Sequence, residues 1–258
     1  KLEETLNGNY AAKSAIDLAL HDRLAKRLGI PLFKLWGVDP RQTLHTSFTI
    51  GLDEPEQMQH KVAQAEDFPI LKVKLGTEHD LKIISTIRDI TNKPIYVDAN
   101  TSWSPKEAIF KIEQLESFDV ALIEQPTKAE DLTGLKFIRE HSNLPIFADE
   151  SVNRSNGIPP LADVVDGINI KLSKCGGLLE AIRMIHVARS HNLQIMIGCM
   201  IESSISITAA AHLTPLVDFA DLDGNLLVSN DPYSGVTVDQ GKLVLSDQPG
   251  IGIVKQQS

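Results

Sequence analysis

The sequence predicts an α/β fold in which eight parallel strands close into a barrel. Two features of the chain predict it. Short apolar runs alternate with segments of helical periodicity, and a charged residue recurs at the end of most of these runs. Short, continuous apolar runs are typical of parallel strands that are buried on both faces. Strands alternating with helices indicate a parallel sheet, and eight of them in one domain favour closure.

The predicted strands lie between residues 45 and 222, with seven helical segments between them. They are 45–50, 70–75, 94–98, 119–124, 145–149, 167–171, 194–198 and 217–222. A doubly wound open sheet would normally carry a glycine-rich phosphate-binding turn after its first strand. Gly51-Leu52-Asp53 follows the first strand instead. We therefore favour a modified TIM barrel of the form (β/α)7β.

The segments on either side of the barrel have other patterns. Residues 11–28 predict a helix, because apolar residues recur at every fourth position and Gly29 and Pro31 then end the pattern. These apolar residues are Ile16, Leu20, Leu24 and Leu28. Residues 233–254 combine glycines with alternating segments, which predicts a hairpin and an extended end. We divide the chain into a leading helix and linker (1–44), the barrel (45–232) and a β tail (233–258).

The composition excludes several classes of function. The chain has 258 residues, 42% of them hydrophobic, and a formal net charge of -9, which is typical of a soluble globular protein. No cluster of Lys and Arg predicts nucleic-acid binding, and no apolar stretch is long enough to predict a membrane span. Cys175 and Cys199 lie far apart without metal-site spacing, so we expect free thiols in the cytoplasm.

Charged residues close five consecutive strands of the predicted barrel. They are Lys74, Asp98, Glu124, Asp149 and Lys171, spaced 22 to 26 residues apart. Active sites of such barrels form at the C-terminal ends of the strands. Because each residue recurs once per strand–helix unit, we expect all five side chains to converge at one mouth.

This order of residues indicates proton-transfer chemistry assisted by a metal. Three carboxylates on neighbouring strands suit one hard divalent cation, and Mg²⁺ is the usual choice. A cation that binds a substrate carboxylate stabilises the enediolate formed when the α-proton leaves. Lys72 lies two residues before Lys74 and points to the same side. The metal and a second ammonium lower the pKa of a lysine base. Lysines on opposite faces can remove and return the proton, which inverts the carbon.

At these positions the sequence resembles the enolase superfamily, within it the group of muconate-lactonising enzymes and dipeptide epimerases. The motifs are Lys72-Val73-Lys74, Asp98-Ala99-Asn100, Glu124-Gln125-Pro126, Asp149-Glu150-Ser151 and Lys171-Leu172-Ser173-Lys174-Cys175-Gly176-Gly177. The resemblance implies that Asp98, Glu124 and Asp149 bind Mg²⁺. It implies acid/base roles for Lys74 and Lys171 and enolate stabilisation by Lys72. We expect Asn100 and Glu150 to orient the metal ligands through hydrogen bonds.

Three further segments are similar to dipeptide epimerases. Asp221-Leu222-Asp223 resembles the Asp-x-Asp motif whose carboxylates hold the α-ammonium group of the substrate. The segments 46–49 and 198–203 resemble the family's first strand and its strand-seven loop. The predicted substrate-binding residues are Asp221, Asp223, Thr49, Met200 and Ile201. The resemblance also implies an N-terminal α+β capping domain that reads the substrate side chain and is largely absent from this chain.

The resulting hypothesis is a cytoplasmic, Mg²⁺-dependent isomerase that epimerises a dipeptide such as L-Ala-D/L-Glu. We expect a small-molecule partner, with neither nucleic acid nor membrane; homo-oligomers are common in the family. Muconate cycloisomerase, o-succinylbenzoate synthase and N-succinylamino acid racemase remain alternatives, because they use the same metal and lysines. Acid-sugar dehydratases rank lower, since they commonly use a histidine in place of Lys171. The non-enzyme alternative is a metal-binding barrel without turnover.

Overall fold

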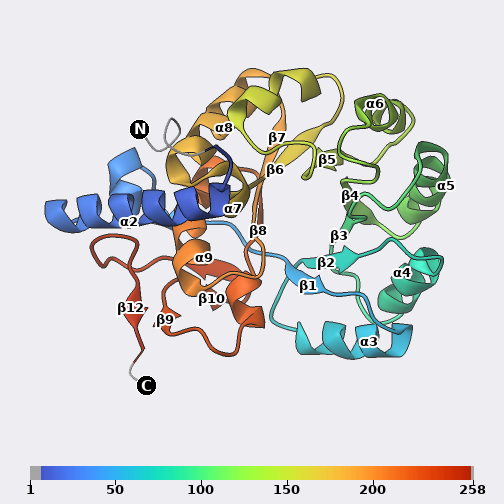
Figure 1. Cartoon of the computed structure of the whole chain (residues 1–258). Coiled ribbons are helices and arrows are strands. Elements are labelled where there is room, and N and C mark those ends of the chain that lie inside the picture. The colour runs from blue at the N-terminus through green and yellow to red at the C-terminus, as the bar shows by residue number, and fades with distance from the viewer. Residues whose placement is uncertain (1–6, 257–258) are drawn as a thin grey trace.

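The chain forms a barrel of eight parallel strands surrounded by helices (Figure 1). The computed structural model describes residues 7–256. The strands follow one another in sequence order from β1 to β8. A bridge between Thr46 and Ala220 joins the two ends of the sheet, where Ser47 N donates to Ala220 O at 3.1 Å. The predicted barrel of eight parallel strands is therefore confirmed.

Every observed strand lies inside its predicted range. The bounds are β1 Phe48–Ile50, β2 Leu71–Lys74, β3 Ile95–Asp98, β4 Val120–Glu124, β5 Ile146–Ala148, β6 Gly167–Lys171, β7 Gln194–Gly198 and β8 Phe219–Asp221. The predicted ranges are up to three residues longer where loop residues extend the apolar run. For β6 and β7 prediction and structure agree residue for residue.

The helices cover the outside of the barrel. They are α3 Pro55–Gln64, α4 Asp80–Arg88, α5 Pro105–Glu116, α6 Leu132–Glu140, α7 Leu172–Cys175, α8 Leu178–Ser190 and α9 Ser204–Ala211. The start predicted at Ser104-Pro105 is confirmed, because Ser104 caps α5 by accepting a hydrogen bond from Glu107 N at 3.3 Å.

The prediction of a helix between β5 and β6 is wrong. The connection between β5 and β6 consists, over its described residues, of loops and two 3₁₀ turns, η3 Ser155–Gly157 and η4 Pro159–Leu161, in place of an α-helix. Pro159 and Pro160 lack backbone N–H groups, so neither can donate the hydrogen bond that continues an α-helix. The connection between β6 and β7 instead contains two helices, α7 and α8.

The interior of the barrel has an apolar layer near the N-terminal ends of the strands. Its buried members are Tyr96, Leu122, Phe147 and Met196, with Ile70 and Phe219 packed against them. The ring of Phe219 meets those of Tyr96 and Phe147 edge to face, with centroids 5.8 and 5.4 Å apart. Gly167 leaves the space for Phe147, because an added Cβ there would collide with the ring. We call these six residues the apolar plug.

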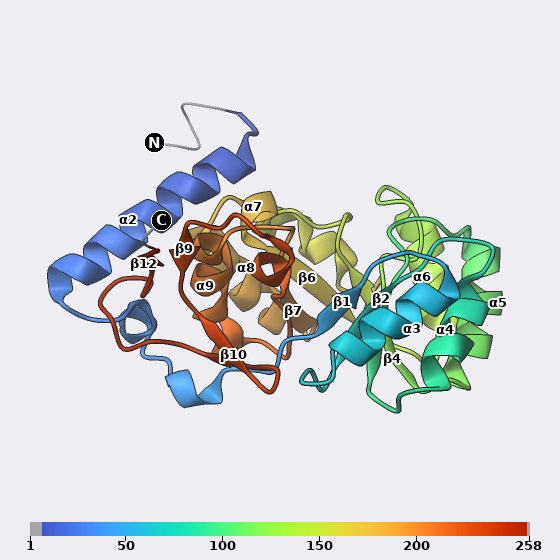
Figure 2. The same ribbon diagram turned by 90° about the horizontal axis from the view of Figure 1, so that it is seen from below.

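The leading helix, α2 (Tyr10–Leu28), lies against the barrel beside α7 and α8 (Figure 2). Asp17 of α2 accepts a hydrogen bond from Leu178 N at 2.7 Å and so caps α8. The residues whose spacing predicted this helix are all exposed: Ile16, Leu20, Leu24 and Leu28. The face of α2 that is buried carries Lys13, Ser14, Leu18 and Ala25.

The C-terminal tail forms two short antiparallel pairs rather than one continuous sheet. The strands β10 (Thr237–Asp239) and β11 (Lys242–Val244) form the predicted hairpin, and β9 (Tyr233–Ser234) pairs with β12 (Val254–Lys255). The tail also binds the leading segment, because Ile251 N donates to Asp22 Oδ1 at 2.9 Å. No helix within residues 7–256 is long and apolar enough to cross a membrane.

Candidate active site

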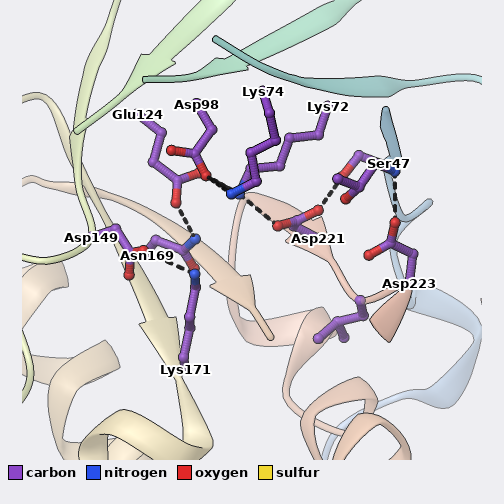
Figure 3. A network of polar contacts seen from close by, with 12 residues as sticks. Ser47, Lys72, Lys74, Asp98, Glu124, Asp149, Asn169, Lys171, Asp221 and Asp223 are labelled. Atoms are coloured by element: carbon purple, nitrogen blue, oxygen red, sulfur yellow. Dashed lines mark hydrogen bonds and ion pairs between the residues drawn. The ribbon is translucent and has the colours of Figure 1, made fainter. Parts of the chain in front are cut away.

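The charged residues that close the strands converge in the mouth of the barrel, as predicted (Figure 3). Inward-facing residues alternate along each strand. As a result, β3 contributes Tyr96 to the apolar plug and Asp98 to the mouth, and β4 contributes Leu122 and Glu124 in the same way. A cavity of about 750 Å³ opens above this layer. Lys72, Lys74, Asp149, Lys171, Asp221 and Asp223 line it.

Lys72 is the centre of the buried charges. Only 1% of it is exposed. Its Nζ lies 2.8 Å from Glu124 Oε2, 3.1 Å from Asp98 Oδ2 and 2.8 Å from Asp221 Oδ2. Burial lowers the pKa of Lys72, but the three carboxylates outweigh this effect and raise the pKa well above its usual value. Its position between three carboxylates suits Lys72 to stabilise negative charge at the centre of the mouth.

The two predicted acid/base lysines enter the mouth from opposite edges (Figure 3). Lys74 Nζ donates to Asp98 Oδ2 at 2.6 Å and to Asn100 Oδ1 at 2.9 Å. Lys171 Nζ donates to Asp149 Oδ2 at 2.9 Å. The side chain of Lys74 is 29% exposed and that of Lys171 only 5%. Burial lowers the pKa of Lys171, but the charge of Asp149 outweighs it and raises the pKa.

The three predicted metal ligands are all buried at the ends of neighbouring strands. Asp98 and Glu124 are direct partners in the register of β3 and β4, and Asp149 follows β5. Burial, together with the negative charges of Asp98 and Asp149, raises the pKa of Glu124 to about 7. Glu124 Oε2 is buried and accepts no hydrogen bond from any described residue, although Lys72 contacts it as an ion pair. Crowded, buried carboxylate oxygens of this kind are suitable ligands for a divalent cation.

Lysine ammonium groups lie between these carboxylates. As the side chains stand, no three His, Cys, Asp or Glu residues within 7–256 are gathered closely enough to hold a metal ion. Lys74 and Lys72 both contact Asp98 Oδ2, while Lys171 and Lys174 contact the two oxygens of Asp149. A cation held by all three carboxylates would take over the counter-charge that the lysines provide. The donor set therefore fits Mg²⁺ by its chemistry.

The two aspartates at the end of β8 have different surroundings. Asp221 accepts hydrogen bonds from Ser47 Oγ at 2.7 Å and from Lys72 Nζ at 2.8 Å, so its charge is already compensated. Asp223 accepts hydrogen bonds from the backbone N–H of Thr49, at 2.6 Å, and from the side chain of the same residue. Burial and the charge of Asp221 raise the pKa of Asp223 to about 6. Asp223 is therefore better suited than Asp221 to receive a cation from a ligand.

The other predicted residues also lie at the mouth. Asn100 N donates to Asp98 Oδ1 at 3.1 Å, and Asn100 Nδ2 donates to Glu150 Oε1 at 3.2 Å. Asn100 thus contacts both a proposed metal ligand and Lys74. Thr49, Met200 and Ile201 line the cavity, and Ile201 is 71% exposed.

The sequence reasoning missed three buried polar contacts of the site. Asn169 donates to Glu124 Oε1 at 2.9 Å, and its position two residues before Lys171 could have revealed that it faces inward. Lys174 lies 2.6 Å from Asp149 Oδ1. Gln125 Oε1 accepts a hydrogen bond from Asp149 N at 2.9 Å. No spacing in the sequence indicates the last two contacts, because they join separate loops.

The fold and the site together define a class of protein, an α/β barrel whose mouth carries lysines on either side of a group of carboxylates. Family models agree. Residues 55–257 match the model for the enolase C-terminal domain-like family. Residues 1–37 match the mandelate racemase / muconate lactonizing enzyme N-terminal domain. The chain belongs to the mandelate racemase and muconate lactonizing enzyme family of the enolase superfamily.

Proteins similar to this chain include dipeptide epimerases, and a solved N-succinyl Arg/Lys racemase of Bacillus cereus is 28% identical, with a TM-score of 0.93 over 99% of this chain and 72% of that one. An L-Ala-D/L-Glu epimerase of Bacteroides thetaiotaomicron is 46% identical over 95% of this chain and 64% of its own length. The substrate-liganded L-Ala-D/L-Glu epimerase of Bacillus subtilis is 34% identical, with a TM-score of 0.92 over 97% of this chain and 74% of that one. The Enterococcus faecalis dipeptide epimerase complexed with Mg and L-Leu-L-Tyr is 36% identical, with a TM-score of 0.90 over 98% of this chain and 75% of that one. The chain thus spans about two thirds to three quarters of these relatives.

Proposed function

We propose that this chain is the catalytic barrel of a Mg²⁺-dependent dipeptide epimerase. The observation that carries the proposal is the pair of lysines at opposite edges of one carboxylate-lined mouth. The buried carboxylate of Asp223, which accepts hydrogen bonds from Thr49, lies nearby. The lysines supply a base on each face of a substrate carbon, and Asp223 supplies a partner for an α-ammonium group. The sequence resemblance and the relatives named above support the same activity.

In the proposed reaction, Asp98, Glu124 and Asp149 would hold Mg²⁺, and the bound cation would offset the negative charge that develops on the substrate carboxylate. One lysine, Lys74 or Lys171, accepts the α-proton of the C-terminal residue. The other donates a proton to the opposite face of the planar carbon, which inverts its configuration. Lys72 remains protonated and stabilises the enolate oxygens. Asn100, which contacts both Asp98 and Lys74, aligns the base with the metal ligand.

Asp223 distinguishes the dipeptide from the alternative substrates. Muconates and succinylated amino acids carry no α-ammonium group. A buried carboxylate facing such a substrate would lose hydration without gaining a partner. An ammonium group about 3 to 4 Å from the carboxylate would instead offset part of the free energy lost by desolvating it. We propose that Thr49, Met200 and Ile201 complete the wall against which the dipeptide lies.

The domain organisation follows from the same proposal. Residues 45–232 form the catalytic barrel, while 1–44 and 233–258 join it to a capping domain. The exposed apolar stripe on α2 (Ile16, Leu20, Leu24 and Leu28) supports this division, because a stripe at helical spacing is normally covered by another element. We also propose a cytoplasmic location, which the free thiols Cys175 and Cys199 support.

The test is α-proton exchange in D₂O. Full-length protein is incubated with Mg²⁺ and a library of L,L-dipeptides, and each dipeptide is followed by mass spectrometry. We expect specific dipeptides to gain the mass of a single deuterium, and the gain to vanish when Mg²⁺ is removed by chelation. If folded, metal-loaded protein exchanges no dipeptide but exchanges N-succinylamino acids, the racemase alternative replaces this proposal.

A further inference from the structure

A buried carboxylate, Asp80, lies beside the mouth without being one of the described residues that line the cavity. It is the first residue of α4 and is only 1% exposed. Burial raises the pKa of Asp80, but hydrogen bonds from Lys111 and the backbone outweigh it, so the pKa is lowered. An ionised, buried carboxylate needs several donors. The donors to Asp80 come from two different loops and a helix.

The first loop directly follows the strand that carries Lys74. Gly76 N and Thr77 N both donate to Asp80 Oδ1 at 2.8 Å. Gly76 has a φ of +124°, and an added Cβ would collide with Ser102 of the neighbouring loop. The two loops are therefore in direct contact above the ends of β2 and β3.

The second loop carries Asn100, the residue that accepts a hydrogen bond from Lys74. Trp103 Nε1 of this loop donates to Asp80 Oδ2 at 2.8 Å. Asn100 and Thr101 have φ values of 42° and 66°, a left-handed conformation that such residues keep only when their surroundings hold them. Lys111 of α5 binds the same oxygen of Asp80 at 2.7 Å and completes the cluster. The helices α4 and α5 lie side by side on this flank of the barrel (Figure 1).

We propose that Asp80 is a positioning residue for Lys74, acting by joining the loop after β2 to the loop after β3. The inference rests on the proposed function, because Lys74 matters only as an acid/base group. Lys74 Nζ is fixed by its strand end and by Asn100, and Asp80 holds the loop on each side. Lys171 pairs with Asp149, which Lys174 and Gln125 contact in turn. This group is linked to the loop after β3 less directly, because Thr101 N donates to Gln125 O at 2.8 Å. Loss of Asp80 should therefore disturb Lys74 more than Lys171.

The experiment compares the two faces of the substrate carbon. The Asp80→Asn variant of the full-length, Mg²⁺-loaded protein keeps the shape of Asp80 and loses its charge. In D₂O, α-proton exchange is measured separately from each epimer of a dipeptide that the wild-type protein exchanges. Lys74→Ala and Lys171→Ala identify which epimer presents its proton to which lysine. Amide exchange of the segments 75–80 and 99–104 is measured in the same proteins without substrate.

We expect Asp80→Asn to slow exchange about 10- to 100-fold from the epimer that depends on Lys74, since small displacements of a catalytic group have effects of this size. Exchange from the other epimer should change far less. Amides in both loops should exchange faster. The matched control is Asp218→Asn, which removes a carboxylate that binds Ile195 N and Arg189 at the far end of the barrel. It should leave the ratio of the two rates unchanged.

Trp103→Phe provides a second test that keeps an aromatic ring and removes only the donor to Asp80, in case Asp80→Asn does not fold. Equal slowing from both epimers, or unchanged loop amides in a folded variant, would overturn the proposal. Failure of the proposed function has a different signature: wild-type protein then exchanges neither epimer. In that case the amide exchange rates of the two loops are the remaining test. Rates that Asp80→Asn leaves unchanged would reject the role of Asp80.

Discussion

The two ends of the barrel interior are built from the same strands and have opposite energetics. At the N-terminal end, the apolar plug buries aromatic and aliphatic side chains, each of which stabilises the fold by about 1.5–3 kcal/mol. At the C-terminal end, Lys72 and three carboxylates are buried in mutual contact. Burying charges costs as much as pairing them returns, or more. Within the barrel interior, the plug therefore stabilises the fold, while the mouth holds charged groups that a ligand or a metal would pair more completely.

The largest effect should come from removing a proton carrier at the mouth. We expect Lys171→Ala to lower turnover by roughly 10²- to 10⁴-fold, the usual contribution of a general acid or base. Folding should survive, because the plug is untouched. Steady-state kinetics with circular dichroism measures both. Lys136→Ala, on the exposed face of α6, is the control. Unchanged turnover in Lys171→Ala would reject its catalytic role.

At the other end, Phe147→Ala should lower the free energy of unfolding by about 3–5 kcal/mol, because it leaves a cavity in the plug. KM of the protein that remains folded should change little, since no residue of the mouth is lost. Denaturant unfolding measures the first effect. Phe110→Ala, at an exposed site on α5, should stay within about 0.5 kcal/mol of wild type. A loss confined to turnover would contradict the division between the two ends.

Asp223 provides a test of how far a buried charge at the mouth destabilises the folded protein. Its pKa is raised to about 6, above that of the unfolded chain, so the folded state binds the proton more tightly. Its unfavourable contribution is absent at low pH and grows as the pH rises from about 4 to above 6, reaching at most about 3 kcal/mol. We expect Asp223→Asn to stabilise the protein at pH 8 and to lose this advantage below pH 4. Unfolding measured at both pH values checks the sign.

The Asp223→Asn variant should also bind a dipeptide more weakly than the wild-type protein. In wild-type protein, KM should rise as the pH falls below about 6, because Asp223 takes up a proton and no longer attracts the ammonium group. In Asp223→Asn, KM should be high and nearly independent of pH in this range. A variant that lost stability at pH 8 would show that Asp223 is a structural residue.

The smallest effect is expected at the boundary between the two ends. Gly198 of β7 pairs with Lys171 and Asp221, and an added Cβ would lie 2.5 Å from Asn169 Oδ1. Gly198→Ala should displace Asn169 from Glu124 and cost about 1–3 kcal/mol of stability by overpacking. Activity should fall with it. Gly157→Ala, where the added Cβ meets nothing, is the control. If Gly198→Ala matches this control, the boundary layer is less tightly packed than the structure indicates.

Sequence-based prediction worked best where the signal was local. The strands β6 and β7 are continuous apolar runs with clear ends, and their ranges agree with the structure. The helix predicted between β5 and β6 is wrong, because the prediction followed the repeating strand–helix pattern and gave too little weight to Pro159 and Pro160. In α2, the apolar spacing predicted the helix correctly, but its exposed side carries Ile16, Leu20, Leu24 and Leu28. Periodicity identifies an apolar face and says nothing of which partner covers it.

The sequence by itself determined the class of fold and which residues reach the mouth of the barrel. Most of the strands are short apolar runs closed by a charged residue, and this pattern depends only on positions close together in the chain. Only the tertiary structure decided how these charges pair. Lys72 binds Asp221, 149 residues later, and Asp80 joins loops that belong to different strands. Such contacts depend on how the barrel closes and on the register between strands, and both arise from packing across the whole core.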